Sequence, residues 1–271
     1  MLRLNNLLQV YAAFPGNAND IGSLKVLELL NPNYNQITSM MLIESERLWT
    51  STLMQLLASR ELEKTWLQSW SDVTLYYADF FIMNSILRLA GRTITFSVAY
   101  ENTIFKIVRL QETAQDYEIS KVSRGDHKAQ WNLYYDLVQG NITDDPLIRE
   151  IFDVQLSFKH QESSFRQWVN YDLEYGYDER HNSSDGLKAR ADLMSSMIPY
   201  TDTIVALSDD YFSEIAKTVY MWKYLKTLLY GIADNSQFAI YFRSQITKLR
   251  DYVKNAPFGT EIKNWVLNEI K

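Results

Sequence analysis

The spacing of apolar residues is helical along most of this chain and changes to strict alternation in one short stretch. Between residues 76 and 90 apolar side chains recur at helical spacing over a wide arc, which is typical of a helix central to a core. From 93 to 100 apolar and small polar residues alternate, and strand-like runs follow at 103–110 and 117–122. This pattern predicts a mainly α, multi-helix bundle with a small antiparallel β-hairpin or meander insert around 93–122. An isolated hairpin is marginally stable, so we expect the insert to pack on a helix or on a partner.

Turn and capping residues set the expected helix boundaries. Ser71–Asp72, Asp126 and either Asp144 or Asp145 before Pro146 have the chemistry of helix N-caps, and Gly91 has that of a helix end. The predicted helices cover residues 2–31 in one or two pieces broken at Pro15–Gly16, 35–70 as a long helix followed by another, 71–90, 126–140, 146–158, 160–176, 179–197, 209–232, 236–254 and 260–270.

The predicted elements fall into three ranges without a linker, a low-complexity tract or a repeat between them. These are an N-terminal helical region at 1–70, a helical core with the β insert at 71–200, and C-terminal helices at 201–271. A chain of 271 residues can bury a substantial core, so we expect the three to pack as one globular unit.

The overall charge and the absence of cysteine exclude several classes of site. A net charge of −6 argues against nucleic-acid binding through the overall field of the protein. Without cysteine there are no disulfides, thiolate nucleophiles or cysteine-based zinc sites, which fits a reducing compartment such as the cytoplasm. No run of 18 apolar residues occurs, and polar residues interrupt Met1–Phe14, so we expect neither a membrane span nor a signal peptide.

Residues with catalytic or metal-binding chemistry do not form a familiar motif. His127, His160 and His181 have no metal-ligand spacing, so no metal and no cofactor are expected. The acidic pairs at 144–145, 178–179 and 209–210 each precede a predicted helix, where they complement the helix dipole. Phosphate-binding glycine loops and a Gly-x-Ser-x-Gly elbow are absent. The sequence therefore favours a non-catalytic protein over an enzyme.

Three segments between residues 70 and 200 resemble the HEPN superfamily of helical bundles. The helix Tyr76–Gly91 resembles that family's aromatic helix ending in Leu-Gly, and His127–Asp136 is similar to a helix that follows a strand-like insert in some members. The segment Tyr177–Gly186 is similar to the region that carries the family's active-site motif. On this resemblance the range 71–200 is a HEPN-like core.

The resemblance implies a catalytic Arg–His site, of which this chain has the Arg but not the His. Active members pair an Arg, which stabilises phosphate charge, with a His that is separated from it by four to six residues and does acid–base work in a dimer. Here Arg180 stands at the Arg position, while the expected His positions hold Asp185, Gly186 and Leu187. His181 directly follows Arg180 and on a helix would point about 100° away from it. Arg124 and His127 are too close together to fit the pattern.

Three functions remain open at this point. The first is a non-catalytic accessory or scaffold subunit that binds another protein subunit. Degenerate members of the family act in this way in bacterial antiphage defence or toxin–antitoxin complexes. Any contact with nucleic acid would then be made through the partner. The second is a metal-independent HEPN-type ribonuclease or nucleotide-binding protein, in which a homodimer would use Arg180 with His181, Asn182 or Asp185. The third is an immunity protein with an acidic face, which the charge of −6 permits.

Overall fold

The computed structural model of this chain describes most of its residues, with gaps. The described residues are 2–12, 14, 23–27, 29–30, 32–64, 68–140, 142–157 and 211–271. The predicted helices at 160–176 and 179–197 lie outside these residues.

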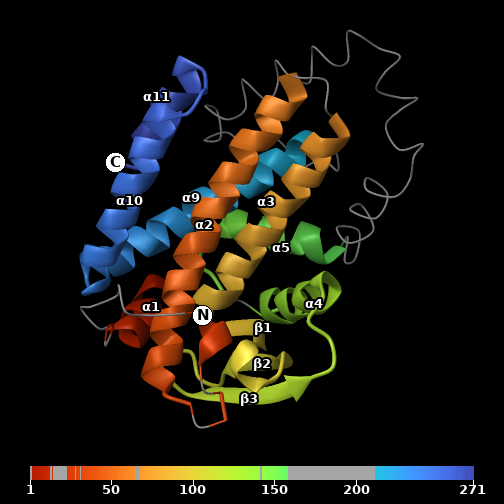
Figure 1. The fold of residues 1–271 in the computed structure, drawn as a ribbon, viewed down its shortest axis with the longest axis vertical. Coiled ribbons are helices and arrows are strands. Elements are labelled where there is room, and N and C mark those ends of the chain that lie inside the picture. The colour runs from red at the N-terminus through yellow and green to blue at the C-terminus, as the bar shows by residue number, and fades with distance from the viewer. Residues whose placement is uncertain are drawn as a thin grey trace.

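The described part of the chain is a helical bundle with one small sheet, so the predicted fold class is confirmed (Figure 1). Its α-helices are α1 (Leu4–Tyr11), α2 (Tyr34–Lys64), α3 (Gln68–Leu89), α4 (His127–Val138), α5 (Pro146–Ser157), α9 (Tyr211–Asp234), α10 (Phe238–Asn255) and α11 (Thr260–Glu269). Its strands are β1 (Arg92–Ser97), β2 (Thr103–Arg109) and β3 (Tyr117–Val122), with 3-10 turns η2 (Leu24–Val26) and η3 (Val98–Tyr100). None of these helices combines the length and the apolar character that a membrane span requires.

One hydrophobic core joins helices from both ends of the chain. It includes residues from α1 through α11, so all three predicted ranges contribute to it. At its centre the indoles of Trp49 on α2 and Trp222 on α9 stack in parallel, with ring centroids 5.0 Å apart. Each indole N–H donates to the backbone carbonyl of the other residue, at 3.0 and 3.2 Å. The pair therefore fixes the position of α9 on α2, although the three-range division itself stays a prediction.

The long helices α2 and α3 lie side by side and pack through small polar side chains (Figure 1). The hydroxyls of Ser45 and Ser85 are 3.0 Å apart, and those of Ser59 and Ser71 are 2.8 Å apart. The prediction that Ser71–Asp72 caps a helix is wrong, because α3 begins at Gln68 and both residues are buried inside it. A short serine satisfies its hydroxyl across the contact and lets the two backbones approach closely.

The predicted caps at Asp126, Asp145 and Gly91 are confirmed, and the acidic pairs at 178–179 and 209–210 lie outside the described residues. The Asp126 carboxylate accepts from the Ala129 N–H at the start of α4. The Asp145 carboxylate accepts from the backbone N–H groups of residues 147 and 148, with Pro146 at the first position of α5. At the end of α3, Gly91 has a φ of +76°, a left-handed conformation in which any other residue is strained.

The sheet is an antiparallel meander in the order β1-β2-β3, and helical segments cover both of its faces. One face carries Phe105, Ile107 and Tyr117 and packs on η2 and the start of α2 in a second apolar cluster. The opposite face carries Ile94 and Val108, which pack against the main core, and α4 lies over it. The expectation that the insert packs on helices is confirmed.

Candidate functional site

The residues predicted to form a HEPN-type site cannot be placed. Arg180, His181, Asn182 and Asp185 lie outside the described residues, as does His160. Their proposed pairing stays a prediction.

His127 is part of the packing between α3 and α4. Its ring stacks on that of Phe80, with centroids 4.0 Å apart and an interplanar angle of 12°. Its Nδ1 lies 2.8 Å from the hydroxyl of Tyr76, and its ring also contacts that of Tyr77. These contacts explain His127 as a structural residue. Within the described ranges, no three histidine, aspartate or glutamate side chains come together in a way that could hold a metal ion.

A buried arginine lies on the face of the sheet opposite α4. Arg109 is 2% exposed, and its Nη2 is 3.3 Å from the hydroxyl of Tyr11 and 3.4 Å from that of Tyr117. Its guanidinium also lies over both rings, 5.6 and 5.7 Å from their centroids. Burial raises the pKa of Tyr11 to about 12, so this hydroxyl stays protonated at neutral pH. The cluster joins α1 to the sheet, and it is enclosed rather than open to a ligand.

Glu46 on α2 has a buried carboxyl group with a raised pKa. It is 2% exposed, and burial raises its pKa from 4.5 to about 7. Thr50 and Tyr241 donate hydrogen bonds to its oxygens, at 3.0 and 3.2 Å. A carboxyl group that titrates near neutral pH is a candidate general acid or base. Glu46 is too enclosed for a substrate to reach, so we assign it to the contact between α2 and α10.

Glu46 makes the stability of the fold depend on pH. Because its folded pKa of about 7 exceeds 4.5, the folded state keeps a proton that the unfolded state loses, and the free energy of unfolding falls as pH rises between these values. Above the folded pKa, ionisation of the buried Glu46 lowers the free energy of unfolding by its full amount, roughly 3 kcal/mol at most. We expect Glu46→Gln to gain stability relative to the wild type as pH rises from about 5 to about 8. Urea unfolding at several pH values measures this, with Glu118→Gln as the control for loss of one exposed carboxylate. A Glu46→Gln effect that does not vary with pH would contradict this assignment.

The outer edge of β3 is the feature of the sheet most suited to recognition. Two backbone hydrogen bonds show which residues of β2 bond to which neighbouring strand. The Arg109 N–H donates to the Gly91 carbonyl on the β1 side at 2.8 Å, and the Leu110 N–H donates to the Asp116 carbonyl on the β3 side at 2.9 Å. With the observed register, even-numbered residues of β2 and β3 bond to each other, so the backbone groups of Ile119 and Lys121 point outward. In the part of the chain that the structure describes, no strand pairs with this edge, whereas β1 on the other side lies beside η2.

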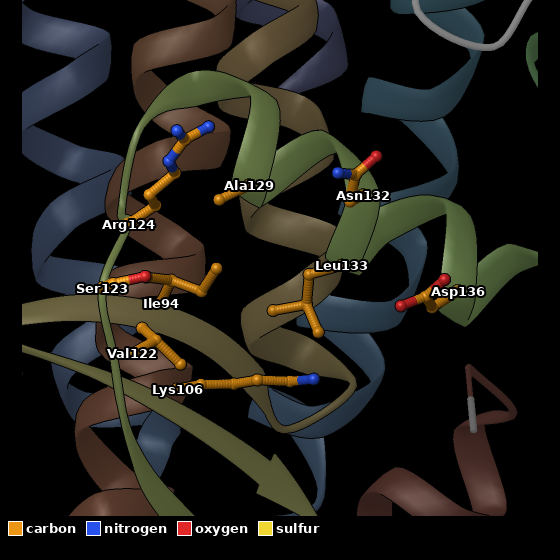
Figure 2. Close-up of a pocket in the computed structure, with 9 residues that line it drawn as sticks. All are labelled: Ile94, Lys106, Val122, Ser123, Arg124, Ala129, Asn132, Leu133 and Asp136. Carbon is orange, nitrogen blue, oxygen red and sulfur yellow. The ribbon is translucent and has the colours of Figure 1, made fainter.

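A pocket opens between the sheet and α4 (Figure 2). Its volume is about 260 Å³, and apolar side chains of the strands and the helix, among them Ile94, Val122 and Leu133, line its walls. The polar groups in its lining are Lys106, Ser123, Arg124, Asn132 and Asp136. Figure 2 shows Lys106 reaching from β2 across the pocket toward the end where Asp136 lies, with Arg124 in the loop at the other end.

The sequence predicts a strand at 103–110 and does not indicate Lys106 or Asp136 as site residues. The one signal in the sequence is that Lys106 and Arg109 are charged residues in a strand of otherwise apolar and β-branched character. Its neighbours in the pocket come from residues 94 to 136, and only the strand register and the position of α4 bring them together.

Comparisons with known proteins leave the family open. No protein-family model, no curated protein and no solved structure matches this chain.

Proposed function

We propose that this protein is a non-catalytic helical subunit that acts by binding another protein, and that the outer edge of β3 receives an extended segment of that protein as a fourth strand. The observation that carries the proposal is the unpaired outer edge of β3 in the described part of the chain. Such an edge offers backbone donors and acceptors in a fixed row, which is the basis of recognition by strand addition. On the HEPN resemblance alone, the partner would be a subunit of a cytoplasmic antiphage defence or toxin–antitoxin complex.

The side chains of β3 indicate what the added strand should carry. Ile119 and Lys121 project on the face of the sheet turned toward η2, and Lys121 is exposed. Glu118 projects on the opposite face and is also exposed. Opposite charges in directly facing positions stabilise paired strands, and like charges destabilise them. We therefore expect a partner segment with an apolar residue facing Ile119, an acid facing Lys121 and a base facing Glu118.

Proline at position 121 tests the edge without disturbing the sheet. The N–H of Lys121 points outward, so Lys121→Pro removes an edge donor and leaves the β2–β3 hydrogen bonds in place. Peptides selected from a random library for binding to the purified wild type should lose at least about tenfold in affinity for Lys121→Pro, because an edge hydrogen bond is lost and the ring meets the incoming strand. Fluorescence anisotropy with labelled peptides measures this.

Two further variants separate loss of the edge from loss of the fold. Lys121→Ala keeps the backbone N–H and should retain most of the binding that Lys121→Pro loses. Ser120→Pro removes an N–H that bonds to β2, so it should destabilise the fold by about 1–3 kcal/mol, whereas Lys121→Pro should not. Selected peptides that bind Lys121→Pro as tightly as the wild type would rule out the edge as the binding surface.

A further inference from the structure

The pocket between the sheet and α4 has an excess of positive charge in an acidic protein. The chain has a net charge of −6, yet the pocket lining contains Lys106 and Arg124 and a single carboxylate, Asp136. Among the ion pairs and side-chain hydrogen bonds of the described residues, none involves Lys106 or Arg124. The cations of the pocket are thus available to a ligand.

A third cation lies close to the same carboxylate. Arg92 is on the α4 side of β1, two residues before Ile94; burial lowers the pKa of its guanidinium, and the nearby Asp136 carboxylate offsets part of this effect. The Nε of Arg92 is buried and has no hydrogen-bond partner among the described residues. Asp136 therefore lies near two cations, Arg92 and Lys106, and does not neutralise both. The balance of charge around the pocket stays positive even before Arg124 is counted.

We propose that this pocket binds a small organic anion, with its phosphate or carboxylate group held by one of the two cations at the ends of the pocket, Lys106 or Arg124, and attracted by the charge of the other. Ammonium and guanidinium groups are the side chains that bind such anions most strongly, and a guanidinium can form two parallel hydrogen bonds to them. Ser123 and Asn132 add a hydroxyl and an amide that can bond to further oxygens of the ligand. This site is independent of the β3 edge and of a protein partner.

The size and the walls of the pocket limit the ligand. A volume of about 260 Å³ lies just below the usual range for small-molecule sites, so the ligand must be small. The apolar side chains of Ile94, Val122 and Leu133 favour a ligand with a carbon skeleton over inorganic phosphate alone. We therefore expect a sugar phosphate or a compound of similar size, and an affinity on the order of 1 mM for the phosphorylated pentose used below.

Isothermal titration calorimetry of the full chain with ribose 5-phosphate tests the proposal, with ribose as the uncharged control. The wild type should bind ribose 5-phosphate and not ribose. Lys106→Gln and Arg124→Gln should both weaken binding, at least tenfold for the cation that holds the phosphate and less for the cation at the other end of the pocket. Asp136→Asn should strengthen binding several-fold, because it removes the one negative charge of the lining.

Lys121→Gln is the matched control, because it removes a lysine charge from the same sheet on the face turned away from α4. It should leave the affinity within about twofold of the wild type, since an exposed charge on the opposite face of the sheet is screened by water and salt. Circular dichroism confirms that each variant is folded. No binding of ribose 5-phosphate at 10 mM, or equal losses in Lys121→Gln and Lys106→Gln, would overturn the proposal.

Discussion

Trp222→Ala is expected to lower the free energy of unfolding by about 3–5 kcal/mol, a large share of the stability of an ordinary domain. The Trp222 side chain is fully buried and stacks on Trp49 with an interplanar angle of 5°. Alanine removes this ring, opens a cavity among α2, α9 and α11, and leaves the Trp49 carbonyl without its indole donor. Both effects destabilise the fold, because the surrounding helices can relax only partly into the space.

Urea unfolding followed by circular dichroism measures this loss. Trp70→Ala is the matched control, because it removes the same side chain from a position that is 63% exposed. It should change stability by less than about 0.5 kcal/mol. Equal effects of the two substitutions would contradict the assignment of the Trp49–Trp222 pair to the centre of the core.

Gly91→Ala is expected to cost about 2–5 kcal/mol through two independent effects. The first is the φ of +76°, which an alanine adopts only with strain. The second is steric, because a Cβ at this position would lie 2.5 Å from Nε of the buried Arg109. Rotation of the arginine does not relieve this contact, since its own Cβ lies 2.8 Å from the same point. The turn from α3 into β1 therefore requires glycine.

Gly140→Ala provides the comparison for Gly91→Ala. A Cβ at Gly140 would meet its nearest atoms at 3.6 and 3.7 Å, which is ordinary contact, and its backbone is outside the left-handed region. The alanine there should be neutral or stabilise by up to about 1 kcal/mol, because it restricts the unfolded chain. Thermal unfolding of both variants measures the difference in their stability. A Gly91→Ala protein as stable as the Gly140→Ala protein would contradict the left-handed conformation at Gly91.

The helices and strands could be predicted because their signals are local. The apolar spacing of residues 76–90 and the alternation from residue 93 each report on neighbours within one element. The helix is confirmed, and the strand is confirmed as far as Ser97, whereas residues 98–100 form a 3-10 turn. The caps at Asp126 and Asp145 are local in the same way. The failure at Ser71 has the opposite cause, because its hydroxyl pairs with Ser59 on another helix instead of with the start of its own.

The candidate surfaces could not be predicted because they depend on contacts between distant residues. Period-two alternation shows which side chains share a face of a strand, but not which strand lies at the edge. The outward position of Ile119 and Lys121 follows only from the register of β2 against β3. In the same way, Lys106 and Asp136 share a pocket only because α4 folds back over the sheet.

Amide hydrogen exchange along β3, free and with a bound peptide, tests the proposed strand addition most directly. In the free protein the amides of Ile119 and Lys121 should exchange much faster than those of Glu118 and Ser120, which bond to β2. A selected peptide should slow exchange at Ile119 and Lys121 and leave Glu118 and Ser120 nearly unchanged. Slow exchange at Lys121 in the free protein, or protection by the peptide only at residues outside β3, would contradict the account.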